Sequence, residues 1–570
     1  MKVLSRPRSR VCAVIVGTGL AALVAAGGST VGAAGGNPAA SIAGAGIHNQ
    51  LLNQREIDVR PEPPNLSALC QSELGQPNPY TNPAPNVDVI NDDAVVSAGS
   101  QTGCRTAQNE TTIAVNPENP NNLVAGANDY RVFNTREGRN DGSGVAYTTT
   151  DGGRTWRNII LPGLTFQTGA TGALSDMDSA GDPAIAFGPH NVVYYANLVF
   201  SRSNDGSGIV VSKSTDGGRT WGQPSIVRVD GVDAAGSPMP TNVSHDKEWI
   251  ATDPITGAVY VSWTQFRTDG TSPITISRST DGGASWTSPT VVNPTFTAGG
   301  ITPYSQGSVP VVRHTDDRRG GFGELFVAYE SAVCQSLNCD QPTDHDATIV
   351  ARSTDGGATF TNTEIGVNYD FPPNQDVGRS TLTGENFRNN SFPMAAIDRN
   401  SGRLYVTWAD DRNGAYSITG ASVKTNGDVV LASSMDGRRF STNVVGSAAD
   451  EVFPAVAAVD GKVAITFYTR AYDPNGIGLD YAAYAGNGPN GIANASMRRL
   501  STQTSNPQVQ FLGIGLVSGT VLQGEFIGDY SAVAMGSDLT LHAAWTDFRG
   551  RPGTNTPNQD VYTQAVRLDR

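Results

Sequence analysis

Charged side chains recur in this chain just before and just after short apolar segments. Carboxylates precede several of these segments, and arginines follow the segment that comes next. Two carboxylates can act on a glycosidic bond as general acid and as base or nucleophile. A guanidinium group can hold a substrate carboxylate with two parallel hydrogen bonds. The candidate catalytic residues are Glu248, Asp182, Glu110, Asp529 and Tyr530, and the candidate substrate-binding residues are Arg267, Arg412, Arg131, Arg470, Arg549 and Lys247.

Glu248 and Asp182 lead the catalytic candidates, and Arg267 and Arg412 lead the binding candidates. Glu248 lies in the sequence His-Asp-Lys-Glu-Trp at 245–249. A neighbouring cation lowers the pKa of a carboxyl group and an apolar wall raises it, so these surroundings can tune Glu248 for either role. Repeated carboxylates and arginines can also be ion pairs or turn caps between repeated units, and both interpretations stay open for each single residue.

Seven pairs of apolar segments position these side chains. Alternation of period two, as in 404–408, is typical of a β-strand, and Asn, Asp, Pro and Gly in the linking turns suit hairpins. Repeated units of four antiparallel strands predict an all-β fold, a β-propeller. Seven units favour seven blades, with six as the alternative if one unit is atypical. The first segments of the pairs begin at Thr111, Pro183, Trp249, Val309, Phe392, Phe453 and Tyr530.

In a propeller the loop into the first strand of a blade and the loop out of the second lie on one face, around the central opening. We therefore expect the candidate catalytic and substrate-binding residues to gather on that face.

Four third strands end in nearly the same octet, at 149–156, 214–221, 279–286 and 353–360, and a copy at 434–440 is one residue short. Aspartate in such a turn accepts backbone N–H bonds, glycine supplies a positive φ, and the final Trp or Phe packs between sheets. An aspartate repeated at equivalent turns cannot be one catalytic residue. We predict that the repeated aspartates are structural, namely Asp151, Asp216, Asp281, Asp355 and Asp436.

The octets resemble the Asp-box (BNR) repeat of sialidases and related propellers, and the resemblance extends over roughly residues 105–570. It implies that the octets join third and fourth strands on the face away from the active site. It also implies a secreted, sialidase-like glycoside hydrolase that acts on extracellular glycans at the central face. The sequence nearest to the Phe/Tyr-Arg-Ile-Pro motif of that family, at 130–133, lacks the proline and follows a second strand. The alternative function is a non-catalytic propeller that binds glycan or protein at the cell surface.

The N-terminus has the pattern of an export signal. Four basic residues within the first ten precede an apolar run at 11–26, and Val-Gly-Ala at 31–33 offers a cleavage site. We predict a signal peptide at 1–33, an extracellular location, a Gly/Pro/Ala-rich arm at 34–103 and the propeller at 104–570. No later segment is long and apolar enough to span a membrane.

Four of the five cysteines follow the signal, an even number that suggests two disulfides in an oxidising compartment. Three pairings are formally possible, and the short loop between Cys334 and Cys339 favours that pair, which leaves Cys70 with Cys104.

The last unit contains three strands before the chain ends at Arg570. An exposed edge would remain there, so we expect the arm to supply the fourth strand, from Val87–Ile90 or from Ala94–Ser97.

The formal charge of −14 argues against nucleic acid and anionic membranes as partners. The six histidines show no metal-ligand spacing. We predict no metal or cofactor, a carbohydrate as substrate or ligand, and a monomer.

Overall fold

The computed structural model describes residues 60–61, 85–90, 107–137, 139–293, 304–315, 321–335, 343–374, 379–417, 422–507, 512–517, 520–549 and 559–568. The predicted signal peptide, Ala94–Ser97 and three of the four remaining cysteines lie outside these residues. The fourth, Cys334, is buried just after a second strand. The two disulfide pairings therefore stay predictions.

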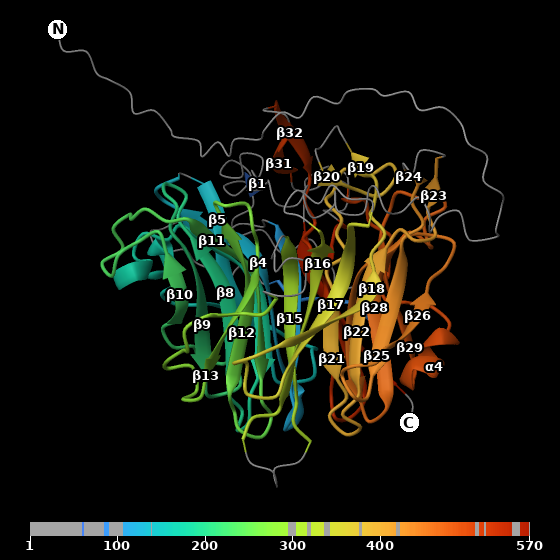
Figure 1. Ribbon diagram of the computed structural model, residues 1–570, viewed down its shortest axis with the longest axis horizontal. Helices are drawn as coiled ribbons and strands as arrows, with labels where there is room; N and C mark the ends of the chain where they lie inside the picture. The colour runs from blue at the N-terminus through green and yellow to red at the C-terminus, as the bar shows by residue number, and fades with distance from the viewer. Residues whose placement is uncertain are drawn as a thin grey trace.

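Seven four-stranded antiparallel sheets form a ring, which confirms the predicted β-propeller and its seven blades (Figure 1). The innermost strand of each blade contacts that of the next blade, and β33 of blade 7 contacts β3 of blade 1. Blade 1 consists of β3 (Gln108–Asn116), β4 (Asn119–Asn134), β5 (Arg139–Thr149) and β6 (Arg157–Ile160). Blade 2 consists of β7 (Ser179–Phe187), β8 (Val193–Phe200), β9 (Ser207–Ser214) and β10 (Ser225–Asp230). Blade 3 consists of β11 (Val243–Thr252), β12 (Val259–Arg267), β13 (Ile274–Ser279) and β14 (Thr290–Val291).

The remaining blades repeat the same order. Blade 4 consists of β15 (Ser305–Arg313), β16 (Glu324–Val333), β17 (His345–Ser353) and β18 (Thr361–Val367). Blade 5 consists of β21 (Met394–Ile397), β22 (Leu404–Asp410), β25 (Asp428–Ser434) and β26 (Ser441–Val445). Blade 6 consists of β27 (Glu451–Val459), β28 (Lys462–Thr469), β29 (Asp480–Asn487) and β30 (Arg498–Arg499). Blade 7 consists of β33 (Ala532–Met535), β34 (Thr540–Asp547), β35 (Asp560–Arg567) and β2 (Val87–Asp88).

The outer strand of blade 7 thus comes from the segment ahead of blade 1. Val87 lies opposite Thr563 and Asp88 opposite Tyr562, in antiparallel register. The Val89 N–H donates to the Val561 carbonyl at 2.9 Å. Beside this strand, the Asn158 amide of blade 1 donates to the Val89 carbonyl at 2.9 Å.

Removal of residues 34–103 should lower the melting temperature of the protein and promote its aggregation, because β35 would become an exposed edge. Thermal melts and light scattering of the truncated chain and of the chain from residue 34 onward make the comparison. Equal melting temperatures would show that closure by this strand adds nothing to stability.

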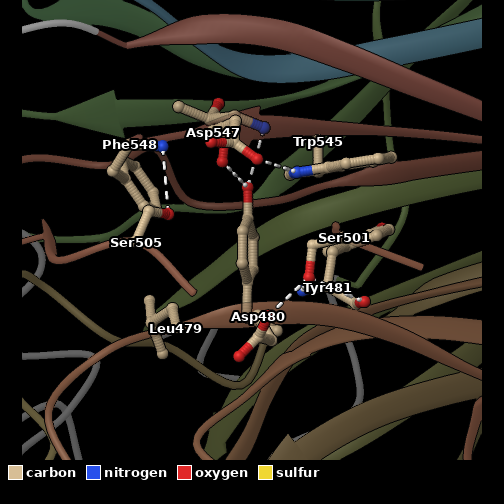
Figure 2. A pocket seen from close by; sticks show the side chains of 10 residues that line it. Leu479, Asp480, Tyr481, Ser501, Ser505, Trp545, Asp547 and Phe548 are labelled. Atoms are coloured by element: carbon tan, nitrogen blue, oxygen red, sulfur yellow. Dashed lines mark hydrogen bonds between the residues drawn. The ribbon is translucent and has the colours of Figure 1, made fainter. Parts of the chain in front are cut away.

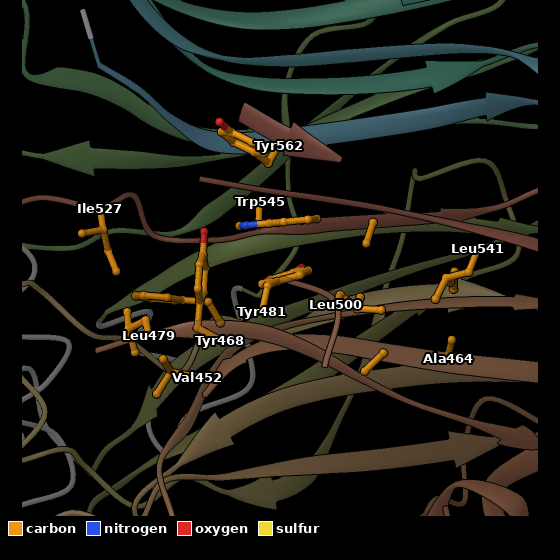
Figure 3. Packing of buried hydrophobic residues seen from close by; sticks show 14 of the residues in the cluster. Val452, Ala464, Tyr468, Leu479, Tyr481, Leu500, Ile527, Leu541, Trp545 and Tyr562 are labelled. Carbon is orange, nitrogen blue, oxygen red and sulfur yellow. The ribbon is translucent and has the colours of Figure 1, made fainter. Parts of the chain in front are cut away.

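The blades pack face to face through apolar side chains that alternate with the strand period. In Figure 3, Tyr481 of blade 6 stacks on Trp545 of blade 7, with ring centroids 5.0 Å apart and an angle of 12° between the planes. The second strands of blades 3, 5 and 7 carry a tryptophan at the same position, and all three side chains are fully buried: Trp263, Trp408 and Trp545. This repeated interface fixes the blades, and with them the loops at their ends.

The predicted octets form the turns between third and fourth strands in blades 1 to 5. In the first, the Asp151 carboxylate accepts hydrogen bonds from the backbone N–H groups of Arg154 and Thr155, both at 3.0 Å, and from the hydroxyl groups of Thr149 and Thr155. Burial acts to raise the pKa of Asp151, but the bonds from Thr155 and Thr149 lower it to about 2. Asp216, Asp281 and Asp355 accept the same set of bonds. In the shortened fifth turn, Asp436 accepts from the N–H groups two and three residues ahead.

The octet turns lie at the end of the blades where second strands begin, because Thr149 at the end of β5 is opposite Leu123 near the start of the second strand. We call the other end, where first strands begin and second strands end, the upper end. The loops there carry β19 (Pro373–Asn374) with β20 (Arg379–Ser380), β23 (Ala415–Tyr416) with β24 (Ser422–Lys424), and β31 (Leu512–Val517) with β32 (Thr520–Glu525) and β1 (Arg60–Pro61) (Figure 1).

The helices are η3 (Phe166–Thr168), η4 (Gly172–Leu174) and α4 (Gly488–Ala493). Within the described ranges no helix is long and apolar enough to cross a membrane.

Candidate functional site

The innermost strands carry a repeated β-bulge near the upper end. The pairing register shifts there in blades 1, 2, 3, 4 and 6. The residue two positions before pairing resumes has a positive φ in these blades, and four of the five are not glycine: Glu110 (56°), Asp182 (51°), Lys247 (52°) and Phe453 (50°). A non-glycine residue in this conformation costs about 1–3 kcal/mol and is typical of functional sites. The strain is concentrated where the predicted site lies.

The residue type at this position differs between the two halves of the ring, charged in one half and aromatic in the other. Blade 4 carries Gly307, where an added Cβ would lie 2.5 Å from the ring of Phe392 in the next blade. From blade 1 to blade 7 the position holds Glu110, Asp182, Lys247, Gly307, Phe392, Phe453 and Tyr530. The centre therefore has a charged half over blades 1 to 3 and an aromatic half over blades 5 to 7.

Lys247 is the centre of the charged half. Its Nζ lies 3.0 Å from Glu110 Oε1, 2.9 Å from Asp182 Oδ2 and 2.8 Å from Asp529 Oδ2, and its side chain is only 8% exposed. The three carboxylates come from blade 1, blade 2 and the segment before blade 7. We call Lys247, Glu110, Asp182 and Asp529, with Asp246 and Arg388, the hub.

Arg388 and two asparagines hold the hub carboxylates in place. The Arg388 guanidinium pairs with both oxygens of Asp529. The Asn128 amide donates to Glu110 Oε2 at 2.7 Å, and its carbonyl oxygen accepts from the Asp182 N–H at 2.6 Å. Asn390 donates to Asp529 at 3.2 Å. Blades 1, 2, 3, 5 and 7 thus meet in one network of hydrogen bonds.

The hub carboxyl groups have pKa values that are displaced in opposite directions. Burial, followed by the charge of Asp182, holds the pKa of Glu110 well above its ordinary value. Burial also acts to raise the pKa of Asp182, but the Lys247 charge and hydrogen bonds from Glu110 and Asp246 lower it. Burial raises the pKa of Asp246 to about 7 against the effect of Lys247. Asp182 is therefore ionised near neutral pH while Asp246, with a pKa of about 7, can hold a proton, an arrangement typical of acid–base sites.

Glu248 lies beside Lys247 in the bulge but points away from hydrogen-bonding groups. It is 1% exposed, and neither carboxyl oxygen has a partner among the described residues. Burial, followed by the charge of Asp182, raises its pKa well above the ordinary value. Tyr530 donates to the Pro183 carbonyl at 3.4 Å and packs edge-on against Trp249. Both lie next to the hub, without the contacts that join its members.

The candidate arginines are held by their own strands. Arg131 pairs with Asp129, Arg412 with Asp410 and Arg549 with Asp547, in each case two residues back. Arg267 donates to Gln265 at 2.8 Å in the same relation, and Arg470 lies 3.0 Å from Asp450 and 2.9 Å from Glu385. Residues two apart on a strand share a face, so the spacing Asp-x-Arg was a sequence signal for these pairs. The structure favours the ion-pair interpretation for four of them, whereas Arg267 is held by the neutral Gln265 side chain. A role in substrate binding stays a prediction for all five.

The sequence candidates did not include Asp246, Arg388, Asn128 or Asn390. Asp246, Arg388 and Asn390 precede first strands, the position that identified the other carboxylates, so their position was a usable signal. Asn128 lies within β4, and no feature of the sequence marks it.

A narrow gap between blades 6 and 7 at the upper end has no room for a water molecule and is lined by none of the hub residues. Figure 2 shows the Asp547 carboxylate facing the Trp545 indole, which donates to it at 2.9 Å. The Tyr468 hydroxyl group accepts from the Thr546 N–H at 2.8 Å and donates to the Thr546 carbonyl at 3.0 Å. These contacts join two blades, so we assign this space to blade packing.

We expect the raised pKa values to make the protein less stable as the pH rises through neutrality. A carboxyl group with a raised pKa holds its proton in the folded state, so stability falls between the unfolded and the folded pKa. Burial raises the pKa of Asp246 to about 7 and those of Glu330 and Glu451 to about 8. Melting temperatures should therefore fall from about pH 5 to about pH 9. A melting temperature that rises over this range would contradict the assignment.

Seven four-stranded blades around a charged hub define this protein as a seven-bladed β-propeller. No known protein family and no curated protein matches its sequence. Its fold is similar to that of a protein of unknown function from Dyadobacter fermentans, with 14% identity and a TM-score of 0.40 over 68% of this chain and 95% of that chain. It is also similar to a Hadza microbial sialidase, with 14% identity and a TM-score of 0.39 over 78% and 73% of the two chains. A GH93 α-L-arabinofuranosidase of Fusarium graminearum is 12% identical, with a TM-score of 0.34 over 58% and 95%. These likenesses concern the fold alone.

Proposed function

We propose that this protein is a glycoside hydrolase whose reaction takes place at the hub. The observation that carries the proposal is the hydrogen-bonded set of Glu110, Asp182 and Asp246 beside Lys247, whose pKa values are displaced in opposite directions. Glycosidases need one protonated and one ionised carboxyl group at the same bond. The hub supplies both.

Asp246 is the general acid in this proposal, because its pKa of about 7 lies near a neutral working pH and its side chain is partly exposed. It gives its proton to the glycosidic oxygen as the bond to the anomeric carbon breaks. Asp182 is the ionised carboxylate and stabilises the positive charge that develops on the sugar. Water then forms the new bond to the anomeric carbon and gives its proton to Asp246, which restores the acid. Glu110 and Lys247 are positioning residues that fix Asp182. The mechanism uses no metal or cofactor.

Release of reducing sugar or nitrophenol from a panel of polysaccharides and aryl glycosides tests this function with the full chain. Turnover of any member supports the proposal. If no member is turned over while a glycan or protein ligand binds the upper end, the alternative of a non-catalytic binding propeller holds.

We further propose that the protein acts outside the cell. The basic and apolar N-terminus of the sequence supports this location. Recovery of a chain that begins near residue 34 from the culture medium is the expected result, and retention of the full-length chain inside the cells would contradict it.

A further inference from the structure

Most candidate arginines at the upper end are engaged by acids of the protein itself, and Arg267 is engaged by the neutral Gln265 side chain. Arg131 and Asp129 are both completely buried, with Nη2 2.6 Å from Oδ2. Arg549 and Asp547 are 5% and 2% exposed and lie 2.7 Å apart. In these pairs both parallel donors of the guanidinium group are directed at the carboxylate two residues back. A substrate carboxylate would have to displace the protein's own carboxylate from the guanidinium group of each of these arginines.

The two hub cations are engaged as well. Lys247 contacts three carboxylates within 3.0 Å. Arg388 pairs with both oxygens of Asp529. A further guanidinium at this end, that of Arg202, pairs with both oxygens of Asp141. Each of these cations, all within the described part of the chain, thus has its charge balanced by the protein.

The hub also holds more acidic than basic groups. Four carboxyl groups, those of Glu110, Asp182, Asp246 and Asp529, face two cations. When Asp246 holds its proton, as the proposed acid must, the ionised Asp182 and Asp529 still balance the charges of Lys247 and Arg388, so the hub has no unbalanced cation for an anionic group. A sugar hydroxyl, by contrast, is a hydrogen-bond donor that suits a carboxylate acceptor.

We propose that the substrate is a neutral glycoside, recognised through its hydroxyl groups, and not an acidic sugar such as a sialoside or a uronide. This inference rests on the proposed function and names the substrate class of the same site. The preference for neutral over acidic sugars comes from the protein's own carboxylates that pair with its cations.

Matched aryl glycosides that differ in one carboxylate provide the test: galactoside against galacturonide and glucoside against glucuronide, with an arabinofuranoside and an aryl sialoside added. We expect kcat/KM for the neutral members to exceed that for the acidic ones by at least about 100-fold, the scale of a lost charge-assisted contact. Faster cleavage of an acidic member overturns the inference and leaves the proposed function standing. No cleavage and no binding of any member overturns both.

Asp529→Asn gives an independent readout, since it removes one negative charge that faces both Lys247 and Arg388. We expect the ratio of acidic to neutral kcat/KM to rise about tenfold or more in this variant, whatever happens to the absolute rate. Asp233→Asn is the matched control, because Asp233 is an exposed carboxylate outside the hub that accepts backbone N–H bonds in its own turn. An unchanged ratio in Asp529→Asn would show that charge balance in the hub does not set the preference, and would overturn the inference.

Discussion

Replacement of Lys247 by methionine is expected to lower the free energy of unfolding by about 3–5 kcal/mol, the usual effect of removing one partner of a buried ion pair. Three carboxyl groups lie within 3.0 Å of its Nζ, and after the replacement only Asp529 would keep a cation, that of Arg388, among the hub residues. Methionine keeps most of the side-chain volume, so packing changes little. Denaturant titrations of the wild-type protein and the variant measure the difference.

Lys424→Met is the control, because Lys424 is exposed and its replacement should change stability by less than about 0.5 kcal/mol. The double variant Lys247→Met/Asp529→Asn should recover part of the loss, since it removes one of the repelling charges. A loss below about 1 kcal/mol in Lys247→Met, the range of surface ion pairs, would show that the hub is solvated and does not join the blades.

Asp246→Asn is expected to lower kcat by about 100- to 10,000-fold on any glycoside that the wild-type protein cleaves, the usual contribution of a general acid. Asparagine has nearly the same shape but has no acidic proton to give. In the wild-type protein kcat should fall as the pH rises through about 7, because Asp246 must be protonated and its pKa is about 7. The variant should lack this limb of the pH profile.

Asp233→Asn is the control for this substitution, because Asp233 is exposed in the loop before blade 3. It should leave kcat and its pH profile unchanged. If Asp246→Asn retained wild-type kcat and the same limb near neutrality, another residue would be the acid, and the role proposed for Asp246 would be wrong.

The local pattern of the sequence was sufficient for the blades. A strand has a side-chain period of two whatever surrounds it, and the turn residues between paired segments have conformational preferences of their own. The strand pairs, the octet turns between third and fourth strands and the count of seven could therefore be read from the chain. The position of carboxylates before first strands also placed Glu110, Asp182 and Asp529 correctly at one end of the ring.

The arginines illustrate what position alone cannot decide. Arg412 follows a second strand, as the sequence indicates. Whether its guanidinium group binds a substrate or Asp410 depends on whether the two side chains lie on the same face of the strand. The period of two answers that question in favour of Asp410, and the structure places the pair 2.6 Å apart.

The sequence by itself thus determined the strands, their grouping into blades and the end of the blades at which charge collects, because these depend on neighbours a few residues apart. Only the tertiary structure decided that the Asp529 N–H donates a hydrogen bond to the carboxyl group of Glu110, 419 positions away. It also decided that Lys247 lies between them and Asp182. These contacts exist because seven blades close into a ring, which brings the bulges of blades 1, 2 and 3 and the segment before blade 7 to a common centre. Burial at that centre then sets the pKa of each carboxyl group, and no property of a single blade fixes it.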